Sequence, residues 1–298
     1  MAVLEPYKGG YYLWKYLPSI PAAVIFCILF IIATAAHAWR LYKTRRWFAI
    51  PFAIGGYMEI IGYATRASAH DRTGKLMPYV IQNNMILLAP VLFAASIYMT
   101  LQKIINNVRG EKHAIIRPAW LTRLFVAGDI LALMIQGGAA GLMVVASQAQ
   151  LGQTVVIIGL VLQVVMFGLF WATAAVFHIR MRHDPSVIYI SVDIKWQETL
   201  CMLYGVSALI MIRSVFRIVE FVMGADGYLL RNEWAMYLFD SVPMWLVMAV
   251  FWQWFPDTIS NHNSFYSVTS MTVLDPAPGP VGSVTDTTGY TNRTGVKP

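Results

Sequence analysis

Long apolar stretches alternate with short polar connections along most of the chain. Seven of these stretches reach the length of about 20 residues that an α-helix needs to cross a hydrocarbon core of about 30 Å. They are Leu17–Trp39, Trp47–Ser68, Tyr79–Gln102, Trp120–Ala146, Gln153–Ile179, Gln197–Met223 and Glu233–Pro256. The pattern predicts an all-α fold, an integral membrane bundle of seven helices.

The segments at the two ends have a different composition. Residues 257–298 are rich in Ser, Thr, Gly, Pro and Asn, so they cannot bury enough apolar surface to become ordered. We therefore predict three parts: an N-terminal segment (1–16), a membrane domain (17–256) and a disordered tail (257–298). The tail is either a passive solvated segment or a segment that binds regulatory partners.

Lysine and arginine are distributed unevenly between the two sides of the predicted bundle. Thirteen of them lie in the connections and tail on one side, against five on the other. Because basic residues stay on the cytoplasmic side of a membrane, the N-terminus is predicted outside and the C-terminus in the cytoplasm. This asymmetry accounts for most of the net charge of +7, so no nucleic-acid partner is predicted. The hydrophobic content of 58% also argues against a soluble fold, since seven helices cannot all be core in 298 residues.

Charged residues occur inside three of the predicted helices at a repeated spacing. Each set follows a 0, +4, +7 pattern, which places its three side chains on one helix face. The sets are Glu59, Tyr63 and Arg66; Arg213, Arg217 and Glu220; and Glu233, Tyr237 and Asp240. A charge near the bilayer centre costs roughly 2.5–3.5 kcal/mol on insertion scales. These faces are therefore expected to point at one another or at water.

The depth of each charge along its helix, at about 1.5 Å per residue, predicts its partner. The predicted pairs are Glu59 with Arg213 near the midplane, Asp240 with Arg217 above them, and Arg66 with Glu220 or Glu233 at the rim. The sequence thus predicts a polar cleft that opens outward. Its charges either contact a polar head group or a proton, or only hold the bundle together.

Further polar residues lie at membrane depth on the neighbouring helices. Gln82 and Asn83 enter from the same side as the charged faces. Asp129 and Gln136 share one face of the fourth predicted helix, where Asp129 either pairs with Arg123 or joins the layer of Glu59 and Arg213. Together with the charged faces, they complete the candidate substrate-binding residues. Proline occurs inside two of the helices, where it frees backbone carbonyls and permits kinks.

The sequence gives no sign of a cofactor, a metal or a catalytic residue. Every lysine lies outside the predicted spans, which excludes a retinal Schiff base, and no GxxxxGK[ST] loop is present for a nucleotide. His37 and His178 lie at the cytoplasmic ends of two helices without further ligands at their depth, which leaves a metal site unsupported. We expect the protein not to be an enzyme.

Several short strings occur in a specific order within residues 11–256. They include Ile86–Pro90 (ILLAP), Ala95–Met99 (ASIYM) and Arg213–Arg217 (RSVFR). In this order they resemble the fungal lipid-translocating exporter family, which includes proteins named for resistance to aminocholesterol and to sphingoid long-chain bases, and a relative linked to porphyrin uptake. The resemblance implies a seven-helix plasma-membrane protein whose partners are membrane lipids. It implies movement of amphipathic lipids toward the outer leaflet and resistance to toxic ones. A receptor-like sensor of stress or lipid, acting indirectly, is the alternative.

Overall fold

The computed structural model describes Trp14 and residues 16–45, 47–71, 73–108, 110–143, 148–183, 196–224 and 227–255. The predicted disordered tail (257–298) and most of the predicted N-terminal segment (1–16) lie outside these residues. Within the described ranges all regular structure is helical, which confirms the all-α fold class.

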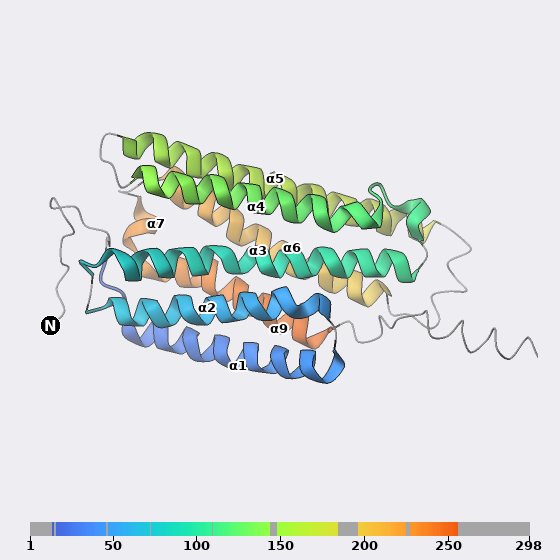
Figure 1. Ribbon diagram of the computed structural model, residues 1–298, viewed down its shortest axis with the longest axis horizontal. Coiled ribbons are helices and arrows are strands. Elements are labelled where there is room, and N and C mark those ends of the chain that lie inside the picture. Colours follow the sequence, from blue (N-terminus) through green and yellow to red (C-terminus); the bar gives the residue numbers. More distant parts are fainter. Residues whose placement is uncertain are drawn as a thin grey trace, which may run out of the picture. The chain divides into compact units, whose positions relative to one another are not determined.

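The described long helices run side by side as an up-and-down bundle (Figure 1). The long helices are α1 (Ile20–Thr44), α2 (Ile50–Ala69), α3 (Leu76–Asn107), α4 (Pro118–Met143), α5 (Ala149–Arg182), α6 (Trp196–Val222) and α9 (Val242–Gln253). Shorter ones are the 3-10 helices Trp47–Ala49 and Gly110–His113, α7 (Tyr228–Arg231), α8 (Glu233–Met236) and the π-helix Tyr237–Ser241.

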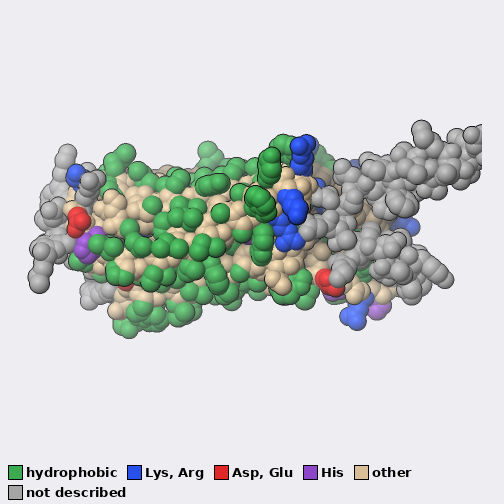
Figure 2. Space-filling model, turned by 90° about the horizontal axis from the view of Figure 1, so that it is seen from below, with side chains coloured by type: hydrophobic (Ala, Val, Ile, Leu, Met, Phe, Trp, Pro, Cys, Tyr) green, Lys and Arg blue, Asp and Glu red, His purple; other side chains and the backbone are tan. Residues whose placement is uncertain are grey.

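Six helical segments of the described chain are long and apolar enough to cross a membrane. They are α1, α3, α4 as far as Ala139, α5 from Gln150, α6, and the continuous run from α8 to α9. Hydrophobic side chains cover the face shown in Figure 2, and charged side chains gather toward its two ends. The protein is therefore a multi-pass membrane protein with a helical bundle.

The second predicted span, Trp47–Ser68, corresponds to α2, which is helical over 20 residues but is not among these six. Glu59, Arg66 and several glycines lower its apolar content. Its inward face is polar, whereas Ile54, Tyr57 and Ile61 on its other face are about half exposed. The helix is therefore amphipathic rather than uniformly apolar.

The contacts between helices form a closed ring. Helix α2 packs between α1 and α3, α4 packs between α3 and α5, and α6 packs between α5 and α9. Helix α9 contacts α1 and closes the ring, and α3 also touches α6 across its interior. This order places the charged faces of α2, α6 and the α8–α9 run around one region of the bundle.

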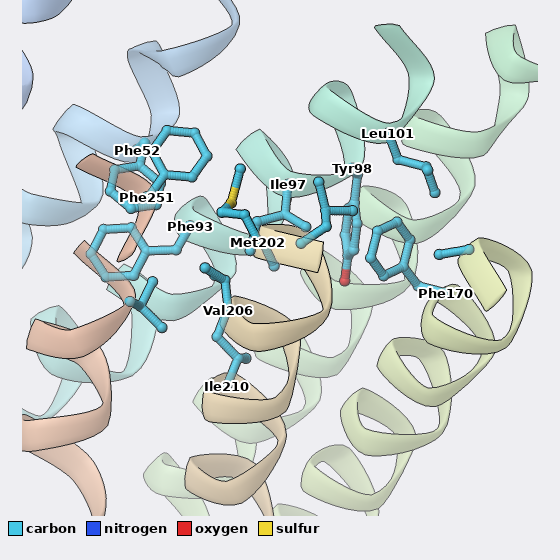
Figure 3. Packing of buried hydrophobic residues seen from close by; sticks show 14 of the residues in the cluster. Phe52, Phe93, Ile97, Tyr98, Leu101, Phe170, Met202, Val206, Ile210 and Phe251 are labelled. Atoms are coloured by element: carbon cyan, nitrogen blue, oxygen red, sulfur yellow. The ribbon is translucent and has the colours of Figure 1, made fainter. Parts of the chain in front are cut away.

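An aromatic core fixes the helices around that region (Figure 3). The ring of Phe52 stacks on Phe251 at a centroid distance of 4.2 Å and lies 4.6 Å from Phe93. These rings come from α2, α9 and α3. A neighbouring group centres on Tyr98, whose ring lies 4.5 Å from that of Phe170 on α5. Glu59 therefore lies two helical turns beyond a rigid apolar contact.

Helices α2 and α3 approach closely because glycine faces the contact. A Cβ atom on Gly62 would lie 2.6 Å from Ile86 Cγ1, and one on Gly55 would lie 2.8 Å from the ring of Phe93. Small residues permit such close backbone approach between membrane helices. The approach brings the backbone around Ile86 next to the polar face of α2.

Candidate functional site

Asp240 pairs with two arginines at the centre of a buried charge network. Its carboxylate forms ion pairs with the guanidinium groups of Arg213 and Arg217, both on α6. Arg217 Nη1 also donates to Glu220 Oε2 at 2.9 Å, so Glu220 is not the partner of Arg66. Asp240 is 0% exposed, and the two arginines are 2% and 8% exposed. The predicted convergence of these faces is confirmed, and so is the predicted pair of Asp240 with Arg217. The second pair of Asp240, with Arg213, was not predicted.

A second cluster of the network surrounds Arg66 near the end of α2. Its Nη2 donates to Glu233 Oε1 at 2.7 Å and to Tyr16 Oη at 2.8 Å, and its Nε donates to Tyr237 Oη at 3.1 Å. The rings of Trp14, Tyr16 and Tyr237 also lie 5.3–5.6 Å from the guanidinium carbon, within cation–π range. Of the two partners predicted for Arg66, Glu233 is confirmed.

The chain segment before α1 closes the network over Arg66. The backbone N–H of Ser19 donates to both carboxylate oxygens of Glu233 at 3.0 Å, and Tyr16 and Trp14 cover the guanidinium. Arg66 is 1% exposed as a result. The sequence predicted an open cleft at this end, but the described structure is closed there. Sequence reasoning missed the role of Trp14 and Tyr16 because they precede the first predicted helix.

Glu59, about two turns before Arg66 on α2, differs from the other carboxylates of the network. It is 1% exposed, and neither carboxylate oxygen has a hydrogen-bond partner among the described residues. The predicted ion pair between Glu59 and Arg213 is therefore wrong. Arg213, Arg217 and Asp240 nevertheless lie within electrostatic range of Glu59.

A proline supplies the second contact of Arg213. Pro90, inside α3, has no N–H to donate to the carbonyl of Ile86 four residues earlier. Arg213 Nη2 donates to this freed oxygen at 2.9 Å. The polar network is thereby connected to the backbone of α3, and a carbonyl that proline leaves without its helical partner is satisfied inside the bundle.

The last helix changes its winding where it contributes to the site. Tyr237–Ser241 forms a π-helix, and Pro243 is the second residue of the α-helix that follows. A π-turn holds more residues than an α-turn and occurs frequently at functional sites. It carries Asp240 and also Ser241, whose hydroxyl forms a hydrogen bond with Tyr63 of α2. Sequence reasoning missed this segment and Ser241, and Pro243 was its only signal.

The two amides predicted on α3 have different environments. Gln82 is buried, and its Oε1 has no hydrogen-bond partner among the described residues. Asn83 is exposed. Successive residues of an α-helix point about 100° apart, so Asn83 does not share the buried position of Gln82. Its place in a substrate site stays a prediction.

The second polar line, on α4 and α5, forms its own contacts. Tyr98 Oη donates to Asp129 Oδ2 at 2.8 Å, and Gln136 Nε2 donates to Gln163 Oε1 at 3.4 Å. The side chain of Arg123 is exposed and lies over the ring of Trp120, 6.0 Å from its centroid. No described ion pair joins Asp129 to Arg123 or to the charge network.

His37 and Arg40 tie α1 to the end of α9. A ring nitrogen of His37 hydrogen-bonds to Met248 O at 2.9 Å, and Arg40 Nη1 donates to Trp252 O at 2.5 Å. This is a structural use of the histidine. Among the residues that the structure describes, no three His, Cys, Asp or Glu side chains converge to hold a metal ion.

The network as a whole offers both signs of charge inside one bundle. Arginine binds phosphate or carboxylate groups through two parallel hydrogen bonds, and the carboxylates can bind a cationic group or a proton. Because Arg66, Arg213 and Arg217 are already paired, an anionic group reaches them only by displacing a carboxylate or by a rearrangement of the helices.

Residues 52–263 match the family model described as RTA1 like protein, and this range contains the network from Glu59 to Asp240. The chain belongs to the RTA1-like family. The resemblance found in the sequence is thereby confirmed. The family range begins in α2 and extends beyond α9, so it covers most of the described bundle.

Proteins of Saccharomyces cerevisiae are similar to this chain over most of its length. The chain is 32% identical over 278 residues to Protoporphyrin uptake protein 1, covering 82% of this chain and 91% of the relative. It is 31% identical to Protein RTA1, covering 84% and 86%. It is 26% identical over 265 residues to the Sphingoid long-chain base transporter RSB1 of strain Lalvin EC1118, covering 76% and 69%. No solved structure matches the chain.

Proposed function

We propose that this RTA1-like protein is a plasma-membrane lipid translocator and not an enzyme. It moves amphipathic lipids, such as sphingoid long-chain bases, sterol-like amines or phospholipids, toward the outer leaflet and so gives resistance to toxic lipids. The observation that carries the proposal is the charge network buried in the bundle. Buried ion pairs contribute little net stability compared with apolar packing, and charge inside a membrane protein usually marks a pathway or ligand. One relative is named a sphingoid long-chain base transporter, which supports the lipid class.

The proposal includes seven crossings, with α2 as the seventh. Its 20 residues span about 30 Å at 1.5 Å per residue, the thickness of a hydrocarbon core. Its charged residues Glu59 and Arg66 are buried, and Ile54 and Ile61 are exposed on the opposite face, where lipid would lie. Seven crossings place the termini on opposite sides. The basic asymmetry of the connections then favours an outside N-terminus and a cytoplasmic tail, the part of the chain open to regulatory partners.

Lipid movement by the purified protein tests the proposal. The protein is reconstituted into proteoliposomes with a fluorescent long-chain base or a fluorescent phospholipid, and transfer between leaflets is followed by quenching from outside. We expect transfer above that of protein-free vesicles, lost in Arg217→Gln and retained in Arg123→Gln. Arg123 is the matched control because it is an exposed arginine outside the network. Transfer no faster than in protein-free vesicles would refute the translocator and favour the lipid sensor.

A further inference from the structure

The ion pairs of the network account for all of its charges except one. Three arginines, Arg66, Arg213 and Arg217, are paired with three carboxylates, Glu233, Asp240 and Glu220. Glu59 is the remaining carboxylate. Its two oxygens have no hydrogen-bond partner among the described residues, although it is 1% exposed.

The surroundings of Glu59 do not support a second negative charge. An ionised carboxylate buried without hydrogen bonds is costly, and such a group becomes neutral instead. Asp240, a carboxylate of the same sign, lies within electrostatic range and also disfavours the charged form of Glu59. Two neighbouring carboxylates do not both stay ionised at low cost. Asp240 has two arginine partners and Glu59 has none, so the charge belongs to Asp240 and the proton to Glu59.

We propose that Glu59 is a proton-binding site, and that release of its proton switches Arg213 from Asp240 to Glu59. The titratable and charged groups within electrostatic range of Glu59 are Tyr63 on its own helix, Arg213 and Arg217 on α6, and Asp240 on the π-helix. Of the two arginines, Arg213 has Asp240 as its one described carboxylate partner, whereas Arg217 also pairs with Glu220. Asp240 keeps Arg217 as a partner when Arg213 leaves, so the exchange strands no charge on Asp240.

The switch changes which helices are held together. With Glu59 protonated, Arg213 joins α6 to the π-helix through Asp240 and to α3 through Ile86 O. When the carboxyl group of Glu59 releases its proton to water, it becomes a carboxylate, and its pair with Arg213 joins α6 to α2. Binding of a proton reverses the step. That this exchange couples lipid movement to a proton gradient rests on the proposed function.

Infrared spectroscopy of the purified protein tests the proton site without any transport. A protonated carboxylic acid gives a carbonyl band that shifts in D2O and is absent from carboxylates and amides. We expect at neutral pH that Glu59→Gln loses such a band. Asp129→Asn is the matched control, since Asp129 is a buried acid outside the network, and it should keep the Glu59 band. Identical carbonyl regions in the wild type and Glu59→Gln would overturn the proposal.

Asp240→Asn tests the switch itself. Removing the charge of Asp240 leaves Arg213 without a carboxylate, so Glu59 should release its proton and its band should disappear at the same pH. A Glu59 band that persists in folded Asp240→Asn would overturn the switch. If this variant does not fold, Arg213→Gln serves instead, and its Glu59 band should be retained at a pH at which the wild type has lost it. If the Glu59 band disappeared at the same pH in the wild type and in Arg213→Gln, the switch would be overturned.

A pH gradient across proteoliposomes tests the coupling. We expect lipid transfer by the wild type and by Arg123→Gln to change several-fold when the gradient is reversed, and transfer by Glu59→Gln to be insensitive to it. Wild-type transfer that ignores the gradient would overturn the coupling and leave the translocator intact. Absence of all transfer would overturn the proposed function and its coupling together, whereas the infrared result would still decide the proton site.

Discussion

Removing the charge of Asp240 is the most informative perturbation of the network. Asp240→Asn keeps the size and shape of the side chain but leaves Arg213 and Arg217 with only Glu220 as a paired carboxylate. Removing one partner of a buried ion pair costs about 3–5 kcal/mol, because it strands the other charge. Two arginines share Asp240. When no other carboxylate compensates, we therefore expect the free energy of unfolding to fall by at least this amount.

Glu59 is the carboxylate that can compensate. By releasing its proton it becomes a partner for one stranded arginine, so Asp240→Asn alone should lose less stability than Asp240→Asn combined with Glu59→Gln. The double variant should show the full loss of about 3–5 kcal/mol. At about 2–4 °C per kcal/mol for a chain of this size, the melting temperature should fall by roughly 6–20 °C.

The assay is thermal unfolding in lipid nanodiscs, with Asp129→Asn as the control. Asp129 accepts one described hydrogen bond, from Tyr98, so its change should cost only about 1–3 kcal/mol. If the Asp240→Asn, Glu59→Gln double variant were no less stable than Asp129→Asn, the pairing described here would be refuted. If Asp240 paired with Arg217 alone, the double variant Arg217→Gln, Asp240→Asn would recover the full melting temperature of the wild type. Because Asp240 also pairs with Arg213, we expect this double variant to recover only part of the loss.

Three further changes test other parts of the structure. Pro90→Ala gives residue 90 an N–H that competes with Arg213 for Ile86 O, so we expect an undiminished melting temperature but slower lipid transfer in proteoliposomes; unchanged transfer would contradict this. Gly62→Ala places a Cβ 2.6 Å from Ile86 Cγ1, so overpacking should lower the free energy of unfolding by about 1–3 kcal/mol. Its control is Gly137→Ala, where nothing lies within 4 Å of the added Cβ. The stability of this control should stay within about 1 kcal/mol of the wild type. A tag at the C-terminus should resist protease added to sealed right-side-out vesicles, and digestion from outside would reverse the proposed orientation.

The sequence by itself determined the helices and the polar face of each. Apolar length predicts a helix regardless of its neighbours, because a backbone in lipid must satisfy its own hydrogen bonds. The 0, +4, +7 spacing placed Glu59, Tyr63 and Arg66 on one face, and all three are buried. Depth also predicted Glu233 as a partner of Arg66, since both lie near helix ends at the same side of the bundle.

Only the tertiary structure decided which charges pair. The π-turn changes the angle at which Asp240 leaves its helix, so counting with a period of 3.6 residues could not predict that it meets two arginines. Pro90 offers Ile86 O to Arg213 only because α3 and α6 touch across the bundle. Pairing depends on distances between helices, and these are set by packing contacts far apart in the sequence. That is why Glu59, predicted as a member of a pair, is the carboxylate that packing leaves alone.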